Sequence, residues 1–386
     1  MTPAARVQTA IEILDRIRAG EAAEKALTSW ARRARFAGAK DRAAIRDHVF
    51  DALRQWRSAA ALGGGENGRA RMLGLLRLQG ADVEALFAGQ GHGPAALGDA
   101  ERATGRLPEG AEAWDLPDWL ADRFAADLGS GAEATALALR TRAPVFVRAN
   151  LLKTTRDAAR TALEEDGVIA RPHPLSETAL EVIKGARGLT RTRAFDQGLV
   201  EMQDAASQAV SDLVPLSGAQ RVLDYCAGGG GKTLALAARA PSAKFEAHDV
   251  DFARMADLPE RARRAGAQVE RVEAPTGLYD VVMADAPCSG SGAWRRAPEG
   301  KWRLTPDRLD ALTAIQREIL DTCAALVAPG GWLAYATCSV LRAENEAQIE
   351  RFLAAHRTWK QGPSRRFLPE DGGDGFYLAC LQRGAA

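Results

Sequence analysis

The stretch Arg221-Val-Leu-Asp-Tyr-Cys-Ala-Gly-Gly-Gly-Gly-Lys-Thr233 decides the fold of this chain. An apolar strand ends at Tyr225, glycines follow, and a helix is expected to begin near Lys232. In an open α/β sheet, ligands bind where strands end in loops. Glycines let the backbone approach such a ligand closely, and the start of a helix provides free N–H groups. This stretch is typical of a cofactor site at a strand end.

Two further strand ends carry cysteines. Asp285-Ala-Pro-Cys288 follows the apolar run 279–284, and Ala336-Thr-Cys-Ser339 ends the run that starts at Trp332. If the three strands lie in one sheet, their ends share an edge. The sequence therefore suggests a nucleotide-like cofactor beside two reactive sulfurs.

The order of the expected elements indicates an α/β fold. After Asp204, helices alternate with strands at 221–225, 244–248, 279–284 and 332–336, which predicts a doubly wound parallel sheet. The tail, 374–381, is expected as a last edge strand. Upstream, strands at 144–150, 179–183 and 199–203 with a helix at 155–166 form a small α/β unit. Helical stripes such as Val7, Ile11, Leu14 and Ile17 fill the N-terminal part.

These patterns divide the chain into three expected parts. Residues 1–135 form a helical region, 136–202 a small α/β subdomain, and 203–386 the catalytic domain. No apolar run approaches the roughly 20 residues that span a bilayer, so we expect no membrane partner. Five cysteines without a Cys-x-x-Cys pair argue against a disulfide framework and a metal site. We expect a cytoplasmic protein, with a monomer as the default.

The charge is distributed unevenly along the chain. Residues 1–80 carry 15 Lys/Arg against 8 Asp/Glu, a balance of +7, and residues 81–135 carry 3 against 11, a balance of −8. A basic N-terminal region is compatible with a nucleic-acid partner. Arginine-rich solvated helices explain the same balance, and charge alone favours that simpler interpretation.

The glycine loop matches neither of two common phosphate-binding motifs. A P-loop, Gly-x-x-x-x-Gly-Lys-Thr, needs its first glycine at the position of Cys226. The dinucleotide fingerprint Gly-x-Gly-x-x-Gly, started at Gly228, is broken by Lys232 and Thr233. The next strand ends in Asp249, and an acid there commonly holds a ribose hydroxyl pair. That acid favours a cofactor loop over a plain glycine turn.

An ordered set of motifs identifies a resemblance. They are Phe146-Val-Arg-Ala-Asn-Leu-Leu-Lys-Thr154, Gln203-Asp-Ala-Ala-Ser-Gln208, Leu223–Thr233, Asp285-Ala-Pro-Cys-Ser-Gly290, Lys301-Trp302, Tyr335-Ala-Thr-Cys-Ser339 and Glu344-Asn-Glu346. With them the chain resembles the RsmB-like RNA (cytosine-5) methyltransferase family over most of its length. Residues 1–80 more loosely resemble the NusB-like helical RNA-binding domain.

The resemblance implies a Rossmann-like methyltransferase sheet and S-adenosyl-L-methionine as cofactor. The implied cofactor-binding residues are Cys226, Ala227, Gly228, Gly229, Gly230, Gly231, Lys232, Asp249, Arg254, Glu273 and Asp285. Glu273 is the candidate for the acid near the adenine. Where the family usually has Ala-Pro-Gly-Gly-Lys, this chain has Gly228-Gly-Gly-Gly-Lys232 and lacks the proline.

The implied reaction is covalent. Carbon 5 of cytosine becomes nucleophilic when a thiolate adds at carbon 6, and a base later removes the carbon-5 proton. By resemblance Cys338 is the nucleophile, Cys288 assists elimination and Asp285 engages the base. Lys232 or Lys301 would favour the thiolate through its positive charge. Cys226, Cys323 and Cys380 are expected to be structural.

The substrate implied is RNA, most closely small-subunit ribosomal RNA. A DNA cytosine methyltransferase is one alternative, in which Cys288 would be the nucleophile. An inactive RNA-binding assembly factor is the other. The basic group Arg295-Arg296, Lys301 and Arg303 is either a phosphate contact or part of a solvated loop.

Overall fold

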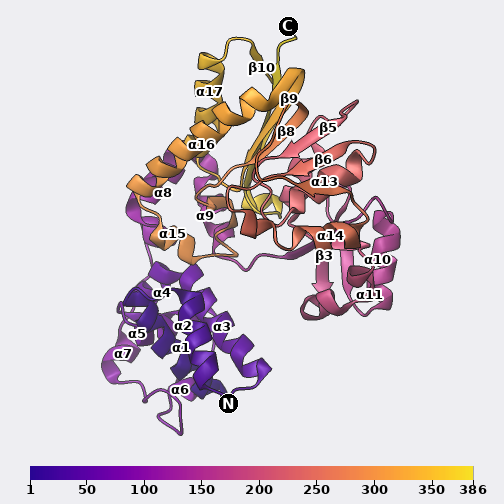
Figure 1. Cartoon of the computed structure of the whole chain (residues 1–386). Helices are drawn as coiled ribbons and strands as arrows, with labels where there is room; N and C mark the ends of the chain where they lie inside the picture. Colours follow the sequence, from indigo (N-terminus) through magenta and orange to yellow (C-terminus); the bar gives the residue numbers. More distant parts are fainter. Residues whose placement is uncertain (386) are drawn as a thin grey trace. The chain divides into compact units, whose positions relative to one another are not determined.

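The computed structural model describes residues 1–385, which form two compact units (Figure 1). Unit 1 comprises 1–142 and 294–303, and unit 2 comprises 143–293 and 304–386. Among the described residues, no helix is both long and apolar enough to cross a membrane. The division into the three parts 1–135, 136–202 and 203–386 remains a prediction, because the two compact units do not test it.

Unit 1 is helical. Its α-helices are α1 (Pro3–Arg18), α2 (Ala23–Arg33), α3 (Ala39–Arg54), α4 (Trp56–Gly63), α5 (Gly68–Leu78), α6 (Val83–Leu86), α7 (Asp99–Ala103), α8 (Asp118–Leu128), α9 (Ala132–Leu139) and α15 (Glu299–Arg303). The predicted apolar stripe of α1 is confirmed: Val7, Ile11 and Leu14 are buried in the core of the unit. Burial of one stripe per helix holds these helices together.

The segment 294–303 lies between two stretches of unit 2 in the sequence but packs into unit 1. Trp294 stacks on Phe124 of α8 with ring centroids 6.2 Å apart. Lys301 Nζ donates to the carbonyl of Arg54 at 2.8 Å, and Trp302 Nε1 donates to that of Leu53 at 2.8 Å. These two donors satisfy carbonyls at the end of α3 that have no partner within the helix.

The contacts of Lys301 change one interpretation of the sequence. Lys301 is buried against the end of α3, and Arg295 is also buried. Arg303 is exposed and pairs with Glu299 at 2.8 Å. The four basic residues therefore form neither a joint phosphate contact at the surface nor a solvated loop, because Arg295 and Lys301 are enclosed within unit 1.

Unit 2 is built on a seven-stranded mixed sheet with the order β10-β11-β9-β8-β5-β6-β7. Its strands are β5 (Arg221–Asp224), β6 (Lys244–Ala247), β7 (Val269–Arg271), β8 (Tyr279–Asp285), β9 (Val327–Thr337), β10 (Trp359–Phe367) and β11 (Phe376–Arg383). Strands β5 to β9 pair in parallel, and β11 pairs antiparallel with both of its neighbours, β9 and β10. The parallel order places the ends of β5, β8 and β9 side by side.

Helices cover both faces of this sheet. They are α12 (Ala205–Asp212), α13 (Gly231–Arg239), α14 (Leu258–Ala265), α16 (Pro306–Leu326) and α17 (Glu346–Ala355). Neighbouring residues of a strand face opposite cores: Val222 packs with α12 and α13, whereas Leu223 packs with α16 and α17. Burial on both faces explains why the central strands are continuous apolar runs.

A second, four-stranded sheet in unit 2 is antiparallel, with the order β2-β3-β1-β4. It contains β1 (Val145–Ala149), β2 (Ile169–Pro172), β3 (Ala179–Lys184) and β4 (Val200–Met202), accompanied by α10 (Arg156–Glu165) and α11 (Arg193–Asp196). Figure 1 shows α10 and α11 beside β3. This sheet forms the small α/β part that the sequence predicts.

The prediction of the last edge strand is wrong. The tail strand β11 lies inside the sheet, paired on both sides with β9 and β10. The edge strand is β10, which carries Pro363 and a run of exposed polar residues. A proline without an N–H is tolerated at an edge, and the polar pattern gives little strand signal.

Candidate active site

The glycine loop joins β5 to α13 in backbone conformations that favour glycine. Gly228 and Gly230 have positive φ values of 49° and 78°. A Cβ on Gly230 would lie 2.2 Å from the Leu258 side chain. Arg148 of β1 donates to the Gly231 carbonyl at 2.8 Å, and Arg261 donates to that of Gly229. The loop is therefore fixed by α14 and by the small sheet, although it lacks the proline of the family pattern.

Asp249, which follows β6, is buried against the glycine loop. Its carboxylate accepts from the Gly228 N–H at 2.9 Å and from the Asp251 N–H at 3.0 Å. The Arg254 guanidinium pairs with it at 3.1 Å. The Arg254 side chain is 58% exposed, so it can leave this carboxylate more easily than the backbone donors can. The structure thus brings together three of the predicted cofactor residues.

Asp224, at the end of β5, is a buried carboxyl group. Its Oδ2 accepts from Thr233 Oγ1 at 2.6 Å, and its Oδ1 has no hydrogen-bond partner among the described residues. Burial raises the pKa of Asp224 to about 7, and the nearby carboxylate of Asp285 acts in the same direction. This group was not among the predicted site residues, because a strand aspartate gives no signal of its own in a sequence.

Lys232 joins the glycine loop to the end of β8. Its Nζ donates to Asp285 Oδ2 at 2.7 Å and lies 4.8 Å from the ring centroid of Phe376. Burial lowers the pKa of Lys232, but the carboxylate of Asp285 and the sulfur of Cys338 outweigh it, so the pKa is raised. Lys232 is therefore a cation in the site, and it is close enough to the Cys338 sulfur to interact with it electrostatically.

The two motif cysteines meet at the ends of neighbouring strands. Cys338 follows β9 directly, and Cys288 lies three residues beyond β8. Their Sγ atoms are 3.4 Å apart. The hydrogen bond to Cys338, together with burial, raises the pKa of Cys288 well above its usual value. Cys288 therefore keeps its proton and can share it with the sulfur of Cys338.

A buried carboxylate that the sequence interpretation missed holds the two cysteine loops together. Glu344 accepts from the Ser289 N–H at 2.7 Å and from the hydroxyls of Ser289 and Ser339. Gln316 of α16 donates to the same carboxylate at 3.1 Å. Asn345 adds a bond from its Nδ2 to the Ser339 carbonyl at 2.9 Å. The motif Glu344-Asn-Glu346 was the available signal, but nothing in it indicates these partners.

The remaining predicted residues surround this centre. Cys226 and Ala227 lie in the loop after β5, and burial raises the pKa of Cys226. Glu273 is exposed just beyond β7, and Cys323 and Cys380 are buried in the sheet cores. Within residues 1–385, no group of three or more His, Cys, Asp or Glu side chains is arranged to hold a metal ion.

The comparisons place this geometry in a family. A family model described as 16S rRNA methyltransferase RsmB/F matches residues 213–382, and an RsmF/B-like ferredoxin-like domain matches residues 116–187. Ribosomal RNA small subunit methyltransferase B of Erwinia tasmaniensis is 35% identical, covering 72% of this chain and 68% of its own. The chain belongs to the RsmB/F family of 16S rRNA methyltransferases.

A second RsmB relative agrees with this assignment, and solved structures share the fold. Ribosomal RNA small subunit methyltransferase B of Xylella fastidiosa strain 9a5c is 37% identical, covering 72% of this chain and 70% of its own. The crystal structure of PH0851 matches with a TM-score of 0.76 at 25% identity and covers 99% of each chain. NSun6 from Pyrococcus horikoshii with SFG matches in fold, with a TM-score of 0.62 at 17% identity over 70% of this chain and 99% of its own. The predicted α/β methyltransferase fold is confirmed.

Proposed function

We propose that this protein transfers a methyl group from S-adenosyl-L-methionine to carbon 5 of a cytosine in small-subunit ribosomal RNA, through a covalent bond between a cysteine and the cytosine. The observation that carries the proposal is the pair of thiols, Cys288 and Cys338, 3.4 Å apart at the ends of β8 and β9. Membership of the RsmB/F family supports RNA as the substrate.

The residues around the glycine loop fit the proposed cofactor. Asp249 offers a carboxylate for the ribose hydroxyls, and Gly228 to Gly231 have no side chains of their own between the backbone and a ligand. Asp224 Oδ1 is a buried polar atom without a partner in the described structure. The related NSun6 structure is described with SFG. When bound, the cofactor supplies an electrophilic methyl group on a sulfonium centre.

Cys338 is the proposed nucleophile. Its sulfur lies at hydrogen-bonding distance from Cys288 and is close enough to Lys232 to raise the pKa of that lysine. A neighbouring cation and a hydrogen-bond donor both stabilise a thiolate. The thiolate adds to carbon 6 of the cytosine, and the ring electrons make carbon 5 nucleophilic. Asp285, held by Lys232, is proposed to hydrogen-bond the polar edge of the base.

Cys288 is the proposed group for elimination. Its pKa is raised first of all by the hydrogen bond to Cys338. Once the Cys338 sulfur is bonded to carbon 6, it no longer carries the negative charge that the hydrogen bond from Cys288 stabilises. The hydrogen bond then weakens, and with it the main cause of the raised pKa of Cys288. Cys288 then releases its proton to solvent and accepts the proton from carbon 5. The bond between Cys338 and carbon 6 breaks, and both sulfurs return to their starting state.

The test is methyl transfer itself. The protein is incubated with tritiated S-adenosyl-L-methionine and small-subunit ribosomal RNA, either free or in a partial particle, and separately with DNA. We expect label in 5-methylcytidine from the RNA and none from the DNA. Label in DNA would favour the DNA-type alternative, and no label in any substrate would favour an inactive assembly factor. A cytoplasmic, monomeric enzyme remains part of this proposal.

A further inference from the structure

A basic turn in unit 1 combines an exposed aromatic ring with cations. We define this basic turn as residues 32–42, which include the end of α2, the connection 34–38 and the first residues of α3. Phe36 is 78% exposed, although phenylalanine is normally buried. Arg32, Arg33, Arg35, Lys40 and Arg42 lie in the same turn with one acid, Asp41, which gives a balance of +4. We propose that Phe36 stacks on an unpaired base of single-stranded RNA whose phosphates contact these cations.

The cations of the basic turn are available to a ligand. Arg32, Arg33, Arg35 and Lys40 are exposed, and no carboxylate of residues 1–385 lies within ion-pair distance of them. Arg42 donates its Nε to the Ala37 carbonyl at 3.0 Å, which leaves its charge unpaired. By contrast, Arg46 of α3 pairs with Glu24. A group of unneutralised cations attracts a polyanion such as an RNA backbone.

The single acid of the turn is already occupied. Asp41 is buried and accepts from the Met1 amino group at 3.3 Å and from Arg6 Nε at 2.8 Å. It also accepts from the Gly38 N–H at 3.3 Å, which fixes the start of α3. Because its two oxygens face these donors, Asp41 holds the turn in place and does not neutralise the exposed cations.

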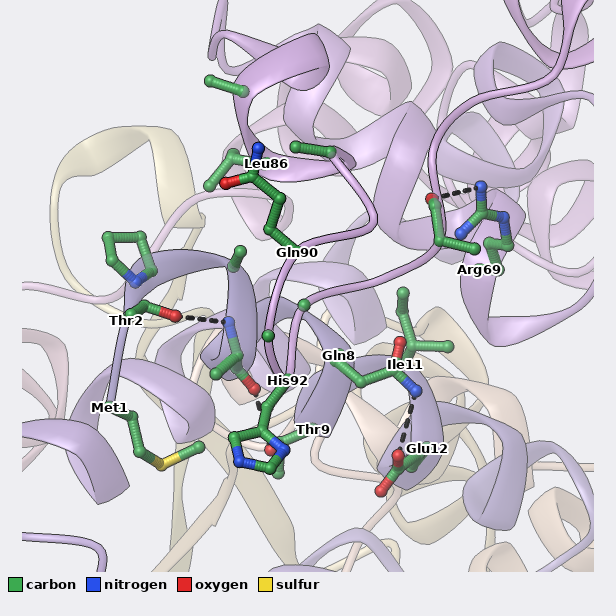
Figure 2. A pocket seen from close by; sticks show the side chains of 18 of the residues that line it. Met1, Thr2, Gln8, Thr9, Ile11, Glu12, Arg69, Leu86, Gln90 and His92 are labelled. Atoms are coloured by element: carbon green, nitrogen blue, oxygen red, sulfur yellow. Dashed lines mark hydrogen bonds between the residues drawn. The ribbon is translucent and has the colours of Figure 1, made fainter.

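Phe36 lies at a hollow of unit 1 that has a volume of about 1420 Å³. Trp30, Met1 and His92 line the same hollow. Figure 2 shows Met1 and His92 in one part of it and Arg69 in another. Arg69 is paired with Glu101, so its charge is already neutralised within the unit. Phe36 and Trp30 offer aromatic surface for bases at this hollow, and the cations of the basic turn adjoin Phe36 in the chain.

This combination favours single-stranded RNA over a duplex or a protein. Stacking needs a base whose face is free, and a duplex hides its base faces. A protein partner would cover Phe36 without needing unpaired cations around it. The inference rests on the proposed function only in taking RNA as the nucleic acid. It assigns base stacking to Phe36 and backbone contact to the cations of the basic turn, separately from the catalytic cysteines.

The test is binding of a short fluorescent single-stranded RNA of mixed sequence to the full-length protein, measured by anisotropy without cofactor. We expect Phe36→Ala to weaken binding about tenfold, or about 1.4 kcal/mol, because the base loses its stacking partner. Phe36→Trp keeps a stacking face and should bind within about threefold of the unchanged protein. Arg35→Gln should lower the salt dependence of the logarithm of the affinity by about 0.7.

Leu107→Ala is the matched control. Leu107 is 77% exposed in the same unit but lies in its acidic stretch, so its loss should not change RNA affinity. The proposal is overturned if the unchanged protein does not bind the RNA, if Phe36→Ala binds like it, or if Leu107→Ala weakens binding equally. Methyl transfer by the unchanged protein is assayed separately, so failure of the proposed function is distinguished from failure of this surface.

Discussion

At the residue scale, the site combines groups that the sequence displays with groups that it hides. Cys288, Cys338 and Asp285 were predictable because each stands at a strand end within a short motif. The carboxylate of Glu344 was not, because its partners Ser289 and Ser339 come from loops fifty residues apart in the chain. A side chain that organises a site through tertiary hydrogen bonds leaves no pattern that one sequence can show.

The first residue-scale prediction concerns Asp249. Asp249→Ala removes the acceptor proposed for the ribose and should weaken S-adenosyl-L-methionine binding by about 1.5–3 kcal/mol, the usual value of a charged hydrogen bond. Calorimetric titration measures this directly. Asp251→Ala is the control, because it removes an exposed carboxylate nearby but keeps the Asp249 acceptor and the Asp251 N–H that holds it. Unchanged affinity in Asp249→Ala would exclude this residue from the cofactor site.

At the element scale, the sequence predicted the strands that are buried on both faces but not the strands at the edges of the sheet. Strands β5, β8 and β9 are apolar runs, which their burial explains. Strands β7 and β10 lie at the two edges and carry polar residues, so they give no comparable pattern. Their existence depends on pairing with a neighbour that the sequence alone does not identify.

A second prediction concerns the end of helix α3, where Lys301 donates to the carbonyl of Arg54. The helix end favours the charged ammonium, but burial lowers the pKa of Lys301 to about 7. The unfolded chain keeps this proton up to about pH 10.4, its usual pKa. Between these values the unfolded state binds more protons, so the contribution of Lys301 to the free energy of unfolding rises with pH.

The measurement is the free energy of unfolding of the unchanged protein and Lys301→Met at pH 7 and 9. The free energy of unfolding of the unchanged protein minus that of Lys301→Met should increase from pH 7 to pH 9 by up to about 2–3 kcal/mol, at about 1.36 kcal/mol per pKa unit. Lys25→Met, at an exposed lysine of the same unit, serves as control. A difference that is constant or falls with pH would contradict the burial of a neutral Lys301.

At the scale of the whole molecule, the sequence predicts which kinds of unit exist better than it predicts which segments belong to each unit. The helical N-terminal region and the α/β sheet were both expected. The passage of 294–303 into unit 1 was not, because its anchors are contacts with α3 and α8 far away in sequence. Deleting residues 1–80 would remove the partners of Lys301 and Trp302, so point variants such as Phe36→Ala probe RNA binding more cleanly.

The most direct test of the account concerns the order in which the two thiols act. If Cys338 opens the reaction and Cys288 closes it, their loss must have different consequences. Cys338→Ala should abolish both methyl transfer and any covalent attachment to RNA. Cys288→Ala should still allow attack and methyl transfer but stall elimination. The double variant Cys288→Ala/Cys338→Ala controls for attachment through another group.

Denaturing gels after incubation with small-subunit ribosomal RNA and S-adenosyl-L-methionine distinguish these states. The account predicts a slow-migrating protein–RNA band from Cys288→Ala, and none from Cys338→Ala or the double variant. A slow-migrating band from Cys338→Ala with none from Cys288→Ala would reverse the two roles and contradict the assignment.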